Sequence, residues 1–397
     1  MDHAAAAERH FFAGTRLLGE GDIAGAEAAF RDAIVANPRM IAAWCNLGVA
    51  LATQKREDEA EACYRTALRL APDYRNAAFN LAYVLLRQGR YEEGWACFEA
   101  RDWYERLERL IPCPRWQGAP LAGKAVLIGV EAGHGDMIQF CRYATRIKAA
   151  GAVRVDVLCH PKLKRLFGRL NGADRAIGLD EPLPHEGWDY WVPPLSLPFL
   201  FSTRVDSVPA ELPYLSADLA QAARWRDFLD DKAADLRVGI VWKGSAGFEN
   251  DADRSLPSLD VLAPLGEVPG VRFVSLQKER ADATPPPFPI ADVMAQVDDF
   301  ADTAAVIVNL DLVIGVDTAV AHLAGALAKP CWVLLPYYQT DWRWLADRDD
   351  SPWYPRVMRL FRQHARRDWS REVAELATAL RLHSAAWHSS PPSSRRA

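Results

Sequence analysis

An aspartate, a threonine and a histidine follow an apolar run in the C-terminal third of the chain. Residues 311–314 predict a buried parallel strand, and Gly315 permits a tight turn after it. Asp317 and Thr318 then stand where they can cap a helix that continues to about residue 328. The backbone N–H groups at such a helix N-terminus attract anions. This segment therefore predicts a site for a phosphate-bearing ligand.

His322 lies five residues after Asp317, about 1.4 helical turns further along the predicted helix. A single histidine on an apolar helix face is more often a hydrogen-bonded core residue than a ligand-binding one. Both interpretations stay open from the sequence.

A glycine-containing loop follows a predicted strand at residues 125–130. The loop reads Gly133, His134, Gly135 and Asp136, and its glycines allow the backbone to approach a ligand closely. Asp136 has two interpretations, because a carboxylate at the start of a helix can cap it or can act as a general base on an acceptor hydroxyl group.

Two cationic side chains follow another predicted strand, at residues 237–242. Lys243 comes directly after the strand and before a glycine, and Arg254 lies further along the same loop. Both cations suit a diphosphate. The alternative for each is a solvated loop with incidental charge.

Aromatic residues gather after a further predicted strand at residues 331–335. Residues 337–344 and 348–354 combine tryptophan and tyrosine with arginine and aspartate. Such side chains either stack on a base or a sugar or seal a domain interface, and the sequence leaves both interpretations open.

Predicted strands alternate with predicted helices in two series, which is the pattern of parallel sheets covered by helices. The remaining expected strands are 153–159 and 272–276, and the expected helices are 136–150, 162–170, 219–229, 258–264 and 299–309. Residues 182–213 are rich in proline and aromatic residues and receive no assignment. The pattern predicts two Rossmann-like halves, with ligands at the carboxyl ends of the strands.

The first hundred residues repeat with a fixed period. Ala26 and Ala60 are 34 residues apart (60 − 26), and Phe30 and Tyr64 share that spacing (64 − 30). Small residues let paired helices approach, and an aromatic residue fills the space between them. The period and pattern resemble tetratricopeptide repeats, of which we count three between about residues 8 and 101.

The composition is that of an ordinary globular protein. The 397 residues are 50% hydrophobic and 25% charged, and the net charge of −5 gives no sign of a general nucleic-acid binder. The seven cysteines are odd in number and lack metal-ligand spacing, so we expect reduced cytosolic thiols. We expect no signal peptide, no transmembrane segment and a disordered C-terminal tail.

Beyond these patterns, the motifs resemble those of lipopolysaccharide heptosyltransferases. The matching residues are Gly135 with Asp136, Lys243, and Gly315 to Thr318 with His322. The whole chain resembles bacterial tetratricopeptide-repeat proteins fused to a heptosyltransferase-like, family 9-like glycosyltransferase. Further matching segments are Gln139–Tyr143, Phe273–Lys278, Asp341–Trp344 and Ser351–Pro355.

This resemblance implies an α plus α/β protein, with a repeat solenoid followed by the B-type glycosyltransferase (GT-B) fold. The expected domains are repeats at 1–108, an acceptor-side half at 109–218, a donor-side half at 219–383 and a tail at 384–397. The resemblance makes Asp136 the base and places Lys243, Asp317, Thr318 and His322 at the nucleotide-sugar donor. It also implies that neither a metal nor another cofactor is required.

Three positions depart from the family pattern as we expect it. Glutamine and leucine are expected at Ala132 and His134, and many of the fused proteins carry a smaller residue at position 243. The donor sugar therefore stays open. Glycan, lipid and protein acceptors are all compatible, as is a protein partner in the repeat groove. We expect a cytoplasmic protein, with peripheral attachment to the inner membrane left open.

Two other classes of protein compete with the transferase interpretation. A catalytically degenerate transferase would leave a repeat-based binding scaffold. A dinucleotide-dependent oxidoreductase fits poorly, because position 138 is isoleucine where the fingerprint needs a third glycine, and Asp156 falls inside a predicted strand.

Overall fold

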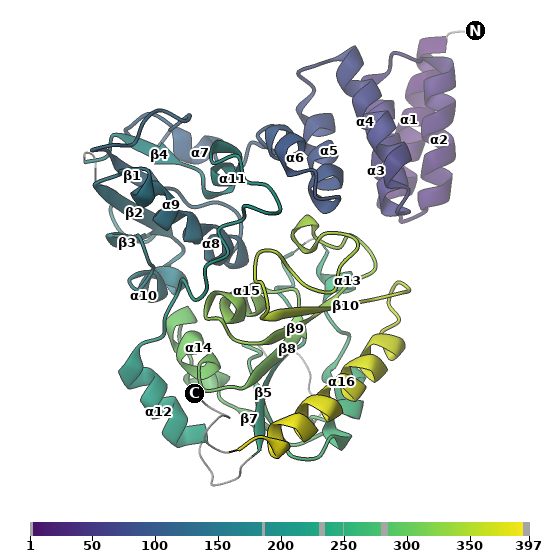
Figure 1. Ribbon diagram of the computed structural model, residues 1–397. Helices are drawn as coiled ribbons and strands as arrows, with labels where there is room; N and C mark the ends of the chain where they lie inside the picture. Colours follow the sequence, from purple (N-terminus) through teal and green to yellow (C-terminus); the bar gives the residue numbers. More distant parts are fainter. Residues whose placement is uncertain (1–2, 185–186, 230–234, 249, 279–284, 392–397) are drawn as a thin grey trace. The chain divides into compact units, whose positions relative to one another are not determined.

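The computed structural model divides the chain into two compact units (Figure 1). It describes residues 3–184, 187–229, 235–248, 250–278 and 285–391. The first unit contains residues 1–102, 201–205 and 341–346, and the second contains the rest. Within the described residues, no helix is both long and apolar enough to cross a membrane.

Three helix pairs build most of the first unit and confirm the predicted repeats. The helices are α1 (His3–Gly19), α2 (Ile23–Ala36), α3 (Ile41–Thr53), α4 (Glu57–Leu70), α5 (Arg75–Arg87) and α6 (Tyr91–Phe98). A Cβ atom on Gly48 would lie 2.5 Å from Cε1 of Tyr64, and one on Gly14 would lie 2.7 Å from Cε1 of Phe30. The first two pairs of helices therefore each pack an aromatic ring directly against a glycine, which explains the repeated pattern of small and aromatic residues.

Two later segments complete the first unit. Trp342 packs edge to face on Trp95, with ring centroids 5.1 Å apart, and its ring centroid lies 6.0 Å from that of Phe98. Nε1 of Trp95 donates a hydrogen bond to the carbonyl oxygen of Thr203 at 3.1 Å. The sequence predicts these two segments to be parts of the transferase halves. They join the repeats instead because their contacts cover the apolar end of α6.

The first parallel sheet of the second unit has the strand order β3-β2-β1-β4. Its strands are β1 (Ala125–Ile128), β2 (Arg154–Cys159), β3 (Arg175–Gly178) and β4 (Tyr190–Val192). The associated helices are α7 (Glu105–Glu108), α8 (His134–Phe140), α9 (Ala144–Ala149), α10 (Lys164–Phe167) and α11 (Leu197–Leu200), with 3₁₀ turns at Cys141–Tyr143, Pro161–Leu163 and Pro194–Ser196. The single helix expected at 136–150 is interrupted at residues 141–143, where Arg142 Nε donates to the Gln139 carbonyl.

The second parallel sheet has the order β10-β9-β8-β5-β6-β7. Its strands are β5 (Leu236–Val241), β6 (Val271–Ser275), β7 (Ile290–Asp292), β8 (Leu312–Val316), β9 (Cys331–Leu335) and β10 (Met358–Arg362). The helices are α12 (Leu219–Leu229), α13 (Asp251–Arg254), α14 (Phe300–Ile307), α15 (Ala319–Ala326) and α16 (Ser370–Ser389), with 3₁₀ segments at Leu259–Glu267, Met294–Gln296 and Trp342–Trp344. The two sheets confirm the predicted parallel α/β architecture.

Two expectations need correction in this half. The helix predicted at 258–264 is a 3₁₀ segment, Leu259–Glu267, that contains Pro264, and proline has no N–H group to donate along an α-helix. The tail predicted from residue 384 is helical as far as Ser389. Ser384 is buried there and donates a hydrogen bond from Oγ to the carbonyl oxygen of Pro269 at 2.8 Å. Residues 392–397 lie outside the described residues.

Candidate active site

The loops that carry Lys243 and Asp317 lie side by side at one edge of the second sheet. They follow β5 and β8, which are neighbours in the sheet, with Val241 opposite Gly315. A Cβ atom on Gly315 would lie 2.2 Å from Cγ1 of Val241, so only glycine fits there. The strand order reverses between β5 and β8, and ligands of open α/β sheets bind at such a switch point.

The glycine loop of the first sheet meets α15 of the second sheet. A Cβ atom on Gly135 would lie 3.0 Å from Cδ2 of His322 and 3.5 Å from Cα of Ala319. The absence of a side chain at Gly135 therefore lets the start of α8 contact the first turn of α15. Two loops that the sequence analysis singled out separately come together here.

Asp136 is the third residue of α8, and Gly133 is the N-cap. The sequence analysis considered Asp136 itself as the cap. Instead, its Oδ2 accepts a hydrogen bond from the N–H group of Gly133 at 2.8 Å, so the carboxylate closes the first turn from inside the helix. The side chain is partly exposed, which is compatible with a second role towards an acceptor.

His134 lies between two other rings. Its ring centroid is 4.7 Å from that of His160 and 5.1 Å from that of Phe300. Burial, and secondarily the neighbouring His160, lower the pKa of His134 to about 4. His134 is therefore neutral at pH 7 and places no positive charge beside Asp136.

The N-terminus of α15 presents an anion-binding geometry. Thr318 is the N-cap residue, with extended backbone, and its side chain makes no capping hydrogen bond. The expected capping role is therefore wrong for the Thr318 hydroxyl. Its Oγ1 atom is buried and has no hydrogen-bond partner in the part of the chain that the structure describes. A buried hydroxyl group in this position is a candidate ligand contact.

His322 is 5% exposed and makes one hydrogen bond to a tyrosine. Its Nδ1 atom lies 2.9 Å from the hydroxyl oxygen of Tyr354, and its Nε2 atom lies 3.8 Å from Oδ1 of Asp317. The two interpretations of His322 are thus compatible, because one ring nitrogen is satisfied within the core and the other faces the aspartate.

Lys243 begins a loop that is held by Gln277. Oε1 of Gln277 accepts hydrogen bonds from the backbone N–H groups of Trp242 at 3.2 Å and Lys243 at 2.9 Å. The sequence analysis assigned no role to Gln277, although it lies in a segment noted for its family resemblance. The glutamine follows β6 and fixes the chain where it leaves β5.

Arg254 is committed to its own loop. Its Nη2 atom donates to Oδ1 of Asp251 at 3.0 Å, and its guanidinium lies 4.3 Å from the ring centroid of Phe248. These contacts favour a structural role, since its charge is already paired. Its predicted role in diphosphate binding therefore has less support than that of Lys243.

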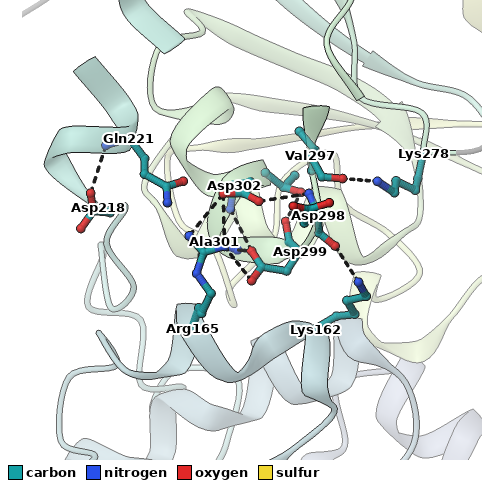
Figure 2. A network of polar contacts seen from close by, with 11 residues as sticks. Lys162, Arg165, Asp218, Gln221, Lys278, Val297, Asp298, Asp299, Ala301 and Asp302 are labelled. Carbon is teal, nitrogen blue, oxygen red and sulfur yellow. Dashed lines mark hydrogen bonds and ion pairs between the residues drawn. The ribbon is translucent and has the colours of Figure 1, made fainter. Parts of the chain in front are cut away.

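A network of charged residues forms a second contact between the two sheets' domains (Figure 2). Arg165 on α10 pairs with Asp299 at 3.0 Å and Asp302 at 3.3 Å, at the start of α14. Nζ of Lys162 donates to the carbonyl oxygen of Asp298 at 2.9 Å. No local sequence pattern indicates this network, because its partners are more than a hundred residues apart.

The aromatic cluster divides by position. Trp342 and Trp344 belong to the first unit, and Trp353 and Tyr354 are fully buried in the second. The three tryptophan rings are packing residues, whereas Tyr354 also hydrogen-bonds His322. Tyr338 remains partly exposed after β9, with the guanidinium of Arg366 4.0 Å from its ring centroid.

Comparisons with known proteins agree with this architecture. The family model "Tetratricopeptide repeat" matches residues 13–74 and 58–112, and the model "Glycosyltransferase family 9 (heptosyltransferase)" matches residues 275–343. Protein FlbA of Caulobacter vibrioides is 30% identical over 298 residues, which are 68% of this chain and 48% of FlbA. The chain thus spans about half the length of this curated relative.

Solved structures with similarity to the chain include both glycosyltransferases and tetratricopeptide-repeat proteins. The E. coli ADP-heptose LPS heptosyltransferase II is 13% identical, with 65% of this chain and 99% of that chain covered and a TM-score of 0.46. The glycosyltransferase family 9 protein from Veillonella parvula is 12% identical, with 66% and 90% covered and a TM-score of 0.44. The TPR2B domain of yeast Sti1 is 22% identical, with 24% and 77% covered and a TM-score of 0.24.

The fold and the site together define a helical repeat protein joined to a parallel α/β domain of two sheets, with a candidate ligand site at a topological switch point. More specifically, residues 13–74 and 58–112 match the tetratricopeptide-repeat model, and residues 275–343, which include Asp317, Thr318 and His322, match the glycosyltransferase family 9 (heptosyltransferase) model.

Proposed function

We propose that this protein is a glycosyltransferase that moves a sugar from a nucleotide-sugar donor to a glycan, lipid or protein acceptor. The observation that carries the proposal is the contact between Gly135 and His322. It brings the carboxylate-bearing turn of α8 to the anion-binding end of α15, and Lys243 follows the strand adjacent to β8. The family 9 match over residues 275–343 supports the same class of reaction.

The proposed chemistry is a single displacement. The carboxylate of Asp136 takes the proton of the acceptor hydroxyl group, and that oxygen attacks the anomeric carbon. The bond from the anomeric carbon to the diphosphate breaks, and the nucleoside diphosphate leaves with the electron pair. Attack opposite the leaving group inverts the anomeric centre. Asp136 would be the general base of this step.

The leaving diphosphate needs stabilisation as its charge develops. The N–H groups at the start of α15 and the buried Thr318 hydroxyl supply donors at fixed positions. Lys243 supplies a positive charge from the neighbouring loop. In this proposal Asp317 accepts hydrogen bonds from the donor, and the reaction proceeds without a bound metal. The repeats would recruit the acceptor or a protein partner.

A thermal-stability panel tests the proposal. ADP-, GDP-, UDP-, TDP- and CMP-sugars are each added at increasing concentration, with Asp317→Ala as the site variant and Asp227→Ala, on the exposed face of α12, as the matched control. A ligand at 100 times its Kd stabilises the folded state by about 2.7 kcal/mol, which corresponds to a shift of several degrees.

One class of nucleotide should raise Tm in the wild type and in Asp227→Ala, and should lose its effect in Asp317→Ala. A wild-type protein that no nucleotide stabilises would instead support the degenerate repeat scaffold.

A further inference from the structure

A tyrosine from the C-terminal part of the chain completes the surroundings of His322. The Tyr354 side chain is fully buried, and its hydroxyl oxygen lies 2.9 Å from Nδ1 of His322. The two ring centroids are 5.8 Å apart. Neither the family resemblance nor the proposed reaction gives this tyrosine a role.

The surroundings of the imidazole distinguish its two nitrogens. Nε2 faces the Asp317 carboxylate at 3.8 Å, and an ionised carboxylate can only accept a hydrogen bond. At 3.8 Å this contact is too long for a hydrogen bond, so the carboxylate favours a proton on Nε2 without fixing it there. With the proton on Nε2, the histidine is neutral and its other nitrogen is unprotonated. Nδ1 is then an acceptor, and the phenol of Tyr354 is the donor that satisfies it.

Tyr354 is itself held from two sides. A Cβ atom on Gly325 would lie 2.4 Å from Cδ1 of Tyr354, so the ring packs against α15 one turn after His322. On another side, the guanidinium of Arg142 lies 4.7 Å from the centroid of the Tyr354 ring. The ring therefore has little freedom to leave Nδ1.

Arg142 is fixed in turn by hydrogen bonds to uncharged groups. Its guanidinium donates to the carbonyl oxygens of Trp353 at 2.6 Å, Gln139 at 2.8 Å and Pro209 at 3.2 Å, and to the hydroxyl group of Tyr214 at 2.9 Å. The bond to Trp353 anchors the residue that directly precedes Tyr354. A buried arginine on the α8 side of the molecule thus sets the position of a tyrosine on the α15 side.

We infer that Tyr354, held by Arg142 and Gly325, is a positioning residue that fixes His322 as the tautomer with its proton on Nε2. The Nε2–H group is then presented beside Asp317, at the end of α15 where the anionic part of a nucleotide-sugar would bind. The consequence for donor binding rests on the proposed function. The tautomer itself is a property of the protein without any ligand.

The tautomer is measured by NMR on full-length protein containing ¹⁵N-labelled histidine. The resonances of His322 are assigned from their loss in His322→Gln. In the wild type, Nδ1 should have the chemical shift of an unprotonated nitrogen and Nε2 that of a protonated one. A wild-type protein with the proton on Nδ1 would overturn the inference. Apart from His322→Gln, which serves for assignment, this measurement does not depend on the folding of any variant.

Two variants then separate positioning from packing. Tyr354→Phe removes the hydroxyl group and should give averaged shifts for the two nitrogens, because both tautomers become populated. Tyr64→Phe removes a buried hydroxyl group from the repeats and leaves the Tyr354 donor and the hydrogen bonds of Arg142 in place, so the wild-type shifts should persist. Wild-type shifts in Tyr354→Phe would overturn the inference, and so would averaged shifts in Tyr64→Phe.

The consequence for binding is measured with ADP, GDP, UDP and TDP by calorimetry. The nucleotide that binds the wild type should bind Tyr354→Phe roughly five to ten times more weakly, as expected for one lost hydrogen bond, and Tyr64→Phe with little change. If none of them binds the wild type, the proposed function fails, while the NMR measurement still decides the tautomer. If a nucleotide binds Tyr354→Phe with wild-type affinity, the role of Tyr354 in donor binding is wrong, whereas the proposed function is unaffected.

Discussion

Asp136 serves two needs with one carboxylate. Its Oδ2 atom closes the first turn of α8 by accepting from Gly133, and the proposed reaction requires it to take a proton. Asp136→Asn separates these needs, because an amide oxygen still accepts a hydrogen bond but does not act as a base at neutral pH. We expect transfer to fall by about 10²–10⁴-fold, with donor affinity within about twofold. Product formation and nucleotide binding are measured on the same preparation.

Asp136→Ala is the companion variant, because it removes both the base and the hydrogen bond to Gly133. It should lose activity to the same extent and also lose about 1 kcal/mol of stability. If Asp136→Asn retains most of its transfer activity, the assignment of the base is wrong. If it loses donor binding as well, Asp136 belongs to the donor site.

His134 links stability to pH through its burial. Its pKa in the folded protein is about 4, below its ordinary value near 6.5, so between these values the unfolded chain binds more protons than the folded one. The free energy of unfolding therefore rises as pH increases from about 4 to about 6.5 and falls as pH decreases. In His134→Gln this part of the pH dependence should be absent.

Urea unfolding at closely spaced pH values measures this slope. His10→Gln is the control, since its side chain is 45% exposed on α1. An unchanged slope in His134→Gln would show that the proton is taken up elsewhere.

At the scale of single residues, the sequence predicted positions better than partners. Spacing along one helix was enough to group Asp317, Thr318 and His322, because helical geometry is local. Tyr354 follows His322 by 32 residues, and no local pattern links the two. The same limit applies to Gln277, whose backbone partners, Trp242 and Lys243, directly follow another strand.

At the scale of elements, α14 begins with an aspartate that has two functions. Asp299 accepts hydrogen bonds from the N–H groups of Ala301 at 2.9 Å and Asp302 at 3.1 Å, and it also pairs with Arg165 (Figure 2). The side chain of Arg165 is 48% exposed, whereas that of Asp299 is 10% exposed. The cap is therefore the more important of the two functions.

This difference predicts a ranking of variants. Asp299→Ala should lower the free energy of unfolding by about 1–2 kcal/mol through loss of the cap, and Arg165→Ala by less than about 1 kcal/mol because an exposed ion pair is screened. Urea unfolding measures both variants. Asp299→Asn is the matched control, since it keeps a capping oxygen and loses the charge, and it should resemble Arg165→Ala. A larger loss in Arg165→Ala than in Asp299→Ala would contradict this order.

The existence and order of most strands and helices were also predictable from the sequence, because their signals are local. Buried parallel strands such as β8 and β9 are short apolar runs bounded by turn residues, and that signal is local. The interruptions of predicted helices by 3₁₀ turns were not predictable in this way. The 3₁₀ turn at residues 141–143 coincides with hydrogen bonds of Arg142 that reach Pro209 and Trp353, and such distant partners leave no periodic pattern.

At the scale of the whole molecule, the repeats do not end where their sequence pattern ends. Residues 201–205 and 341–346 complete the first unit, and Trp342 is fully buried within it. Trp342→Ala should destabilise this unit by about 3–5 kcal/mol through lost burial and the cavity that remains. Hydrogen exchange should increase in α5 and α6.

Trp103→Ala is the control, because that side chain is 45% exposed, and it should leave exchange in α5 and α6 unchanged. If Trp342→Ala also leaves exchange in these helices unchanged, the segment at 341–346 does not contribute to the stability of the repeats.

The late return of the chain to the repeats has a consequence for synthesis. The ribosome adds 244 residues between Asp102 and Ala346 (346 − 102), which takes roughly 10–50 seconds at about 5–20 residues per second. During that interval the rings of Trp95 and Phe98 lack the indole that covers them in the finished protein. The nascent chain therefore emerges with an apolar surface at the end of its first-made helices, which is the kind of surface that chaperones bind.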